Sequence, residues 1–243
     1  MRRNFTWWLY QPYKWLVLIP LIFILSFLFG ALAIVLSYSI NDKVGSRIGG
    51  QWWARVIAFL TPMLVSVRNS ELMDRNQSYV IVANHLSTYD IFLMYGWIKN
   101  DFKWVMKKEV RKIPGVGFGS AAVGHIFIDR SDTKSAVASI NKAKDKIKGG
   151  TSVVFFPEGT RSVNGQLRPF KKGAFRFALE LGVPILPVTI RGTEKVLPAG
   201  SFDIFPGKAE MIVHKPIAVS DYTTDKMPEL IDRVKKVIAS ELN

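Results

Sequence analysis

The feature that most restricts how this chain can fold is a run of 27 residues, Trp15 to Asn41, that contains no charged side chain. As a helix this run would extend ~40 Å, which is longer than the ~30 Å hydrocarbon core of a bilayer. Pro20 and Gly30 lie inside the run and could bend such a helix. The run predicts a membrane segment, and a single spanning helix is its simplest interpretation.

A secretory signal is a second interpretation of this run. Arg2 and Arg3 supply a basic start, and residues 31–33 (Ala-Leu-Ala) resemble a cleavage site. Cleavage is disfavoured because the apolar run continues unbroken to Leu36.

A third interpretation is a helix that enters and leaves the same leaflet. Three cations lie on each side of the run: Arg2, Arg3 and Lys14 before it, and Lys43, Arg47 and Arg55 after it. Equal flanking charge gives no orientation for a spanning helix. It is expected where both ends stay on the cytosolic side.

A second apolar segment covers residues 51–67. Its apolar residues recur at helical spacing and form one face: Trp52, Val56, Ile57, Leu60, Met63, Leu64 and Val67. Only twelve uncharged residues, 56–67, follow Arg55, and these are too few to span. Paired tryptophans at 7–8 and 52–53 suit the headgroup level. We therefore favour two helices that dip into one leaflet, in a membrane-associated motif of residues 1–68 that precedes a domain of residues 69–243.

Composition narrows the classes of partner. Lysine and arginine total 33 against 19 acidic residues, and this net charge of +14 favours nucleic acid, an acidic carrier protein or the phosphate-rich face of a membrane. Seven tryptophans in an apolar chain favour the membrane and argue against nucleic acid. Because the chain has no cysteine, disulfides, thiolate metal sites and a cysteine nucleophile are excluded.

After Arg68, short apolar runs alternate with amphipathic stretches. We expect strands at 79–83, 152–156, 185–190 and 209–213, and helices near 89–98, 133–148, 173–181 and 228–242. This alternation predicts an α/β fold in which helices flank a largely parallel sheet.

The first predicted strand is followed at once by residues 84–90, Asn-His-Leu-Ser-Thr-Tyr-Asp. A histidine can take a proton from an alcohol near neutral pH, and a carboxylate can hold its other ring nitrogen. Within one helix, His85 and Asp90 would differ by ~140° in azimuth, so they face each other only if His85 lies on the turn before the helix. Ser87-x-x-Asp90 is equally a helix-capping pattern, and taken alone that structural interpretation is the stronger one.

The second polar cluster follows the strand at 152–156. Pro157 and Gly159 end the strand, and Glu158, Thr160 and Arg161 lie on the loop at its carboxyl end, where α/β sheets place ligands. Arginine at this position is typical of a bidentate phosphate contact, although a single arginine in a polar turn is usually only solvated. Residues 169–173, Pro-Phe-Lys-Lys-Gly, precede a predicted helix and favour an anion more weakly.

Four ordered blocks resemble the glycerolipid acyltransferase family, and most closely its bacterial 1-acylglycerol-3-phosphate acyltransferases. They are Asn-His-x4-Asp at 84–90, Gly-x-Ile-Phe-Ile-Asp-Arg at 124–130, Phe-Pro-Glu-Gly-Thr-Arg-Ser at 156–162 and Val-Pro-Ile-Leu-Pro-Val at 183–188. The resemblance covers about residues 70 to 215. Four blocks in order are specific, whereas each alone is common.

The resemblance implies transfer of an acyl chain from acyl-CoA or acyl carrier protein to the free sn-2 hydroxyl of 1-acylglycerol-3-phosphate (lysophosphatidic acid). The product would be phosphatidic acid, made for phospholipid biosynthesis at the cytosolic face of the inner membrane. It also implies a two-helix membrane motif at the amino end. We expect no cofactor besides the acyl donor.

The resemblance also assigns residue roles. His85 would be the general base, oriented by Asp90. Arg161 would contact the acceptor phosphate, in a group of substrate-binding residues that also contains Lys107, Arg130, Gly159, Thr160 and Lys171. Glu158 would hold the glycerol or order its loop, and backbone amides near Gly159 are one candidate for stabilising the oxyanion.

Rival functions stay open. A metal hydrolase would need more ligands, and the remaining histidines, His125 and His214, lie in no metal-spaced motif. A covalent acyl-enzyme is disfavoured because cysteine and a Gly-x-Ser-x-Gly elbow are both missing. Acyl transfer to a different lysolipid headgroup, or anionic-lipid binding without catalysis, are the alternatives.

Overall fold

A computed structural model describes residues 5–129, 131–163 and 165–242. In this part of the chain a seven-stranded sheet has the order β1-β7-β6-β2-β5-β3-β4. Neighbouring strands pair in parallel except β6 with β7, which confirms the predicted α/β fold. The strands are β1 (Met63–Arg68), β2 (Val80–Ala83), β3 (Phe102–Lys107), β4 (Ile126–Ile128), β5 (Ser152–Phe155), β6 (Ile185–Arg191) and β7 (Gly207–Val213).

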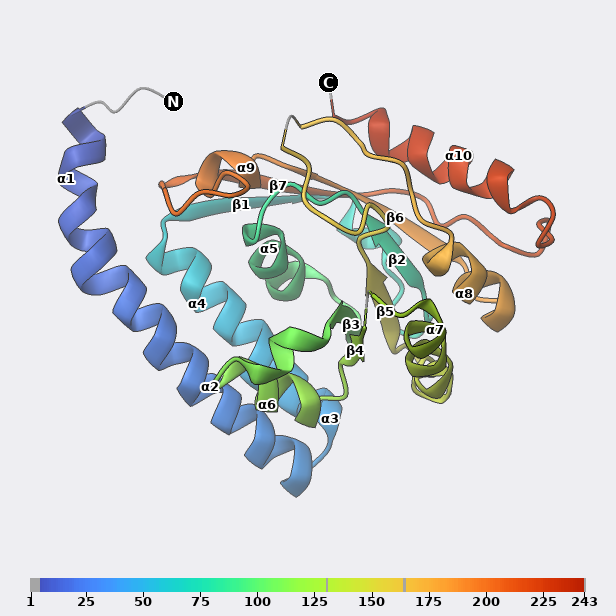
Figure 1. The fold of residues 1–243 in the computed structure, drawn as a ribbon, viewed down its shortest axis with the longest axis horizontal. Coiled ribbons are helices and arrows are strands. Elements are labelled where there is room, and N and C mark those ends of the chain that lie inside the picture. Colours follow the sequence, from blue (N-terminus) through green and yellow to red (C-terminus); the bar gives the residue numbers. More distant parts are fainter. Residues whose placement is uncertain (1–4, 130, 164, 243) are drawn as a thin grey trace.

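Helices cover both faces of the sheet (Figure 1). One face packs against α4 (Trp53–Leu60), α5 (Tyr89–Trp97) and α9 (Thr193–Val196). The other packs against α7 (Thr133–Lys142), α8 (Gly173–Leu181) and α10 (Met227–Ala239). The remaining α-helices are α1 (Phe5–Tyr13), α2 (Ile19–Ser39), α3 (Asp42–Gly45) and α6 (Val116–Ala122).

The central strand β2 shows why such short apolar runs form this sheet. All four of its residues are buried, with Val80 and Val82 in the core under α8 and α10 and Ile81 and Ala83 in the core under α4 and α5. Successive side chains of a strand point to opposite faces, so a strand covered on both sides must be continuously apolar. All four residues of β5 are buried as well, as expected for a strand inside the sheet. Since β5 pairs with β2 in parallel, the carboxyl ends of the two strands lie at the same edge.

The amino-terminal apolar run is one long helix from Trp7 to Ser39, long and apolar enough to cross a membrane by length and composition. A wider, π-helical turn at Lys14–Leu18 joins α1 to α2. Pro20 follows it and has no N–H to donate four residues back, to Leu16, which this irregular turn accommodates. Figure 1 shows this helix, in blue, along one side of the molecule.

Both ends of the long helix contact the α/β part of the chain. Near its start, the Tyr13 hydroxyl donates to the carbonyl of Leu60 at 2.8 Å. Just beyond its end, Asp42 forms an ion pair with the buried Lys103 of β3 at 2.9 Å. The helix therefore lies along the domain, with both ends beside it.

The second apolar segment differs from the prediction of one helix over residues 51–67. A π-helical stretch, Ser46–Trp52, leads into α4, which ends at Leu60, and residues 63–68 form the edge strand β1. Pro62 interrupts the helix because it lacks a backbone donor. The side chains of residues 63–67 alternate between the two faces of β1. An apolar run this short fits a strand as well as a helix, so its sequence alone did not separate the two. Part of the segment assigned to the membrane motif thus belongs to the sheet.

Two further strands were not predicted. In β3 Lys103 interrupts the apolar pattern by which a buried strand is recognised. Lys103 is nevertheless buried, because its charge is balanced by Asp42 and Asp101, at 2.9 and 3.2 Å, from outside the strand. Strand β4 has only three residues and carries little periodicity of its own. The expected strands at 79–83, 152–156, 185–190 and 209–213 correspond to β2, β5, β6 and β7.

Candidate active site

The turn after β2 is held by a side-chain amide. Asn84, fully buried, donates to the carbonyl of Ile190 at 2.9 Å and accepts from the amide of the same residue at 2.7 Å. Through these two bonds the Asn84 side chain links the residue after β2 to the neighbouring strand β6, beyond Ala83, the last residue of β2 that pairs with it. The chain leaves the sheet at this point, so the next residue, His85, lies on the turn before α5. The sequence motif contained Asn84, but its partner lies 106 residues away.

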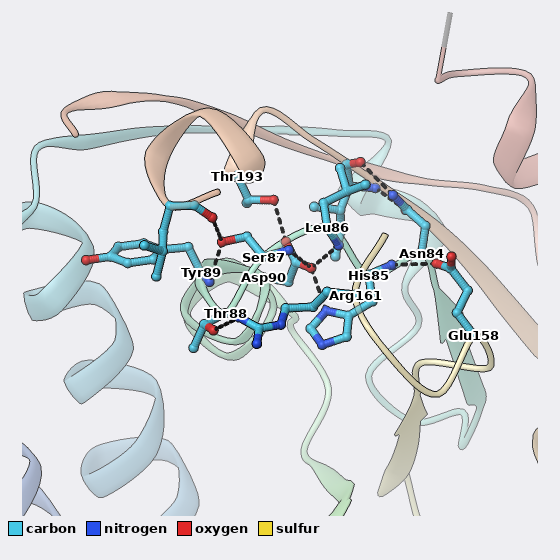
Figure 2. Close-up of polar contacts among 12 residues, drawn as sticks. Asn84, His85, Leu86, Ser87, Thr88, Tyr89, Asp90, Glu158, Arg161 and Thr193 are labelled. Carbon is cyan, nitrogen blue, oxygen red and sulfur yellow. Dashed lines mark hydrogen bonds and ion pairs between the residues drawn. The ribbon is translucent and has the colours of Figure 1, made fainter. Parts of the chain in front are cut away.

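His85 and Asp90 face each other across this turn, as the sequence predicted for a histidine placed before the helix. His85 Nδ1 lies 2.7 Å from Asp90 Oδ2, and Asp90 is fully buried whereas the His85 side chain is 17% exposed. Figure 2 shows Asp90 between Thr193, whose hydroxyl donates to Oδ1, and the imidazole. With Asp90 ionised, Nδ1 carries the proton and Nε2 is left as the acceptor.

Asp90 also caps the start of the helix. The amides of Leu86 and Ser87 donate to Oδ2 at 2.7 and 3.0 Å. The Ser87 hydroxyl accepts from the amide of Tyr89 at 3.1 Å. The capping and histidine-orienting interpretations of Ser87-x-x-Asp90 are therefore both realised by one carboxylate, which the backbone holds in place.

An aromatic ring packs on the imidazole of His85. Phe156, which follows β5 directly, stacks on it with ring centroids 4.0 Å apart and an interplanar angle of 11°. Trp104 of β3 stacks in turn on Phe156, at 5.6 Å. This stack limits rotation of the imidazole while leaving its edge accessible.

The loop after β5 is fastened to the backbone of His85. Glu158 Oε1 accepts from the His85 amide at 2.8 Å, and Oε2 accepts from the amide of Arg168 at 2.9 Å. The Ser162 amide donates to the His85 carbonyl at 2.7 Å. Burial raises the pKa of Glu158, whose side chain is nearly enclosed. Both oxygens of Glu158 thus accept from backbone amides, an arrangement that orders the loop.

Arg161 reaches the same turn from this loop. Its Nη1 donates to the Thr88 hydroxyl at 2.8 Å, and the side chain is partly exposed beside His85 (Figure 2). A guanidinium has five donors, so the bond to Thr88 leaves most of them for other acceptors. Thr160, the preceding residue, is exposed.

Gly159 and Lys171 meet at the base of the loop. The backbone of Gly159 has φ +75°, and a Cβ there would lie 2.9 Å from Lys171 Nζ, so glycine permits this close approach. The Gly159 amide donates to the carbonyl of Phe156 at 3.0 Å. That bond argues against Gly159 itself as the oxyanion donor.

Two more cations, Lys107 and Arg130, were predicted to bind substrate. Lys107, at the end of β3, is exposed and pairs with Glu109 at 3.7 Å. Arg130 lies outside the described residues. The residues brought together around the His85 turn are thus Asp90, Glu158 and Arg161.

An apolar cleft of about 400 Å³ has Phe156 in its lining. Its walls include Val105, Ile128 and Phe177, and Lys171 and Arg176 lie on its lining. Within the described residues, no three His, Asp or Glu side chains gather in a way that could hold a metal ion.

Comparisons with known proteins match this arrangement. A family model described as Acyltransferase matches residues 64–191. The chain is 39% identical over 165 residues to the chloroplastic 1-acyl-sn-glycerol-3-phosphate acyltransferase BAT2 of Brassica napus, covering 68% of this chain and 46% of that protein. It is 30% identical over 220 residues to the 1-acyl-sn-glycerol-3-phosphate acyltransferase of Saccharomyces cerevisiae, covering 88% and 72%.

A solved structure agrees as well. The crystal structure of the 1-acyl-sn-glycerophosphate acyltransferase PlsC of Thermotoga maritima superposes with a TM-score of 0.78 and 28% identity, covering 91% of this chain and 92% of that one. The chain spans between 39% and 62% of the length of three plant and algal relatives. With more than half of its residues inside the matching family model, the chain belongs to the acyltransferase family.

Proposed function

We propose that this protein transfers an acyl chain from acyl-CoA or acyl carrier protein to the sn-2 hydroxyl of 1-acylglycerol-3-phosphate, giving phosphatidic acid. The observation that carries the proposal is the contact of His85 Nδ1 with the buried carboxylate of Asp90 at 2.7 Å, with Nε2 left to accept a proton beside Arg161. The relatives named for this reaction and the similarity to PlsC support the choice of substrates.

In the proposed reaction His85 is the general base. Nε2 takes the proton of the acceptor hydroxyl while that oxygen attacks the thioester carbonyl, and Asp90 offsets the charge that the imidazole gains. The tetrahedral intermediate collapses as the carbon–sulfur bond breaks, and the thiolate leaves with the proton that His85 returns. A new ester and a free thiol are the products, and no metal or resident cofactor takes part.

Arg161 would bind the acceptor phosphate. Its bond to Thr88, three residues after His85, holds the guanidinium close to the base, so a bound phosphate would bring the neighbouring hydroxyl to His85. Lys107, Arg130 and Lys171 would add charge, and Gly159 and Thr160 would line the same loop. The apolar cleft lined by Phe156 suits an acyl chain, because its walls are largely apolar and its volume is about 400 Å³.

The proposed location is the cytosolic face of the inner membrane. Apolar side chains of α2 are exposed along the long helix, including Phe23, Phe27 and Val35. An exposed apolar surface of this extent is typical of a membrane-associated protein. A lysolipid acceptor would reach the site from that membrane.

The acceptor headgroup provides the test. Arg161→Ala should lower kcat/KM for lysophosphatidic acid by roughly ten- to a hundredfold, because a charge-assisted contact contributes ~1.5–3 kcal/mol. The much lower rate with monoacylglycerol, which has no phosphate, should change far less. The measurement is initial rates with both acceptors and both donor types, with Lys215→Ala, an exposed cation outside the site, as control.

Equal losses with both acceptors would show that Arg161 supports the fold or the donor instead. Preference of the wild-type enzyme for another lysolipid would favour the alternative headgroup. The absence of transfer to any acceptor would favour a lipid-binding protein without catalysis.

A further inference from the structure

A second polar cavity, of about 370 Å³, lies at the opposite edge of the sheet from His85. Its lining includes Phe102, the first residue of β3, and Gly150, which comes shortly before β5. His85 and Glu158, in contrast, follow the carboxyl ends of β2 and β5. The cavity is therefore separate from the proposed catalytic site. We call it the basic cavity because of its charges.

Five cations line the basic cavity: Lys43, Arg47, Arg55, Arg75 and Lys99. Its acidic residue, Asp101, is paired with the buried Lys103 at 3.2 Å. Among the described residues, none of the five cations lies within ion-pair distance of a carboxylate. Like charges gathered around one cavity repel each other, and an anion bound between them would relieve that repulsion.

One of these cations is held in place by its surroundings. Arg55 Nε donates to the carbonyl of Gly96 at 2.7 Å. Its guanidinium lies 5.8 Å from the ring of Trp52 and 5.9 Å from that of Trp97. Cation–π contacts and the hydrogen bond restrict the side chain, so the cavity has a prearranged donor beside its exposed cations.

The basic cavity opens beside an apolar surface. Ile48, Trp52 and Phe59, spaced four and seven residues apart on one helical face, are 37%, 53% and 80% exposed. Trp52 belongs both to this face and to the cavity lining. A tryptophan between an apolar face and arginines is the arrangement expected at the boundary between acyl chains and phosphate headgroups.

We propose that the basic cavity binds the phosphate headgroup of an anionic membrane phospholipid, while the acyl chains lie along the face formed by Ile48, Trp52 and Phe59. The bound lipid anchors the second helical segment and is not consumed by the reaction. The apolar face distinguishes a lipid from a soluble phosphate, which would use only the cations.

The test uses the full chain in an uncharged detergent. Native mass spectrometry counts bound phosphatidylglycerol and phosphatidylcholine during titration of each lipid. The site variant is Arg47→Gln with Arg75→Gln, two exposed side chains whose replacement spares the fold. The control, Lys215→Gln with Lys226→Gln, removes the same charge from exposed positions outside the cavity.

We expect the wild-type chain to bind one phosphatidylglycerol at least about tenfold more tightly than phosphatidylcholine. The site variant should lose this preference, whereas the control and Arg161→Gln should keep it. Acyl transfer in the same micelles should be unchanged in the site variant. The binding measurement does not depend on catalysis. If the proposed acyl transfer were not found, lipid binding to the basic cavity would still be tested.

Four results would overturn the proposal. The site variant could keep the preference, or the control could lose it equally, which would mean non-specific attraction to net charge. Loss of binding in Arg161→Gln would place the lipid in the catalytic site. Inorganic phosphate that binds with the same dependence on Arg47 and Arg75, and displaces the lipid, would identify a soluble-anion site.

Discussion

At the scale of single residues, Asp90 makes more contacts than its motif indicates. One oxygen meets His85 Nδ1 and two backbone amides, and the other accepts the hydroxyl of Thr193. Four donors in a fully buried setting fix the carboxylate, so in the proposed reaction the orientation of His85 would cost little reorganisation.

Replacement of the pair should abolish transfer without unfolding the protein. His85→Ala removes the proton acceptor. Asp90→Asn offers an amide N–H that can donate to Nδ1 of His85, which would hold the imidazole in the tautomer whose Nε2 carries the proton. We expect a near-complete loss for the first and a loss on the order of a thousandfold for the second, by analogy with other His–Asp pairs. Steady-state rates of purified protein, with circular dichroism to check folding, provide the measurement.

The matched control is His214→Ala, which removes a histidine that bonds to Thr189 at 2.8 Å on another part of the sheet. It should keep most of its activity. More than about a tenth of wild-type turnover in folded His85→Ala would contradict general-base catalysis by this residue.

At the scale of elements, glycines decide how closely the long helix packs. A Cβ on Gly30 would lie 2.1 Å from the carbonyl oxygen of Gly115, at the start of α6. The sequence left room for Gly30 to bend the helix; in the structure it makes room for another backbone. The tight packing of α2 against α6 depends on this missing side chain.

Gly30→Ala should therefore destabilise the protein. In an open helix this change would stabilise by up to ~1 kcal/mol, but the clash with a backbone oxygen forces the helices apart at a cost of roughly 1–3 kcal/mol. Gly173→Ala, in α8 with nothing within 4 Å of the added Cβ, is the control and should be near neutral. Thermal unfolding in detergent measures both. Equal effects would show that α2 and α6 do not pack closely.

His125 joins three elements and predicts a pH dependence. Its Nδ1 accepts from the amide of Trp104 in β3 at 3.3 Å, and Nε2 lies 3.1 Å from the Tyr95 hydroxyl in α5. Burial, reinforced by Lys103 and Lys146, lowers the pKa of His125 to about 3. The residue is therefore neutral in the folded chain at pH values where the unfolded chain takes up a proton.

The sign of the effect follows from this difference. The contribution of His125 to the free energy of unfolding is complete well above the unfolded pKa of ~6.5 and is lost as pH falls toward the folded value, by about 1.6 kcal/mol between pH 6.5 and pH 5. Chemical denaturation of the wild type and of His125→Gln at several pH values tests this. The glutamine variant should show a smaller loss on acidification, and parallel curves would refute the assignment to His125.

At the scale of the whole molecule, both ends of the long helix lie against the same domain. Lys14 pairs with Asp203 at 3.8 Å near one end, and Lys43 donates to the carbonyl of Gly149 at 3.1 Å beyond the other. A helix that crossed the bilayer would place these two contacts on opposite sides of the membrane. The geometry favours a helix that stays in one leaflet.

Labelling of single cysteines tests this topology, because the chain has no cysteine of its own. Lys43→Cys and Ser220→Cys are both exposed, one beyond the long helix and one in the domain. An impermeant maleimide added from the domain side of sealed vesicles should modify both positions. Protection of position 43 until the vesicles are permeabilised would instead establish a spanning helix.

The sequence by itself determined the features that depend on neighbouring residues. The apolar runs of β2 and β5 indicated a buried parallel sheet, and the position of His85 two residues after β2 placed it on a turn from which Asp90 is within reach. Local geometry suffices there, since the pair is five residues apart. The long apolar helix was evident for the same reason.

Only the tertiary structure decided what surrounds the pair. Thr193 lies 103 residues from Asp90, and the amide of His85 meets Glu158 from 73 residues away. Strand β3 was missed because Lys103 is neutralised by Asp42, which lies 61 residues earlier. No local pattern encodes such contacts: a carboxylate near a loop predicts an exposed charge until the fold supplies the donors that allow it to be buried.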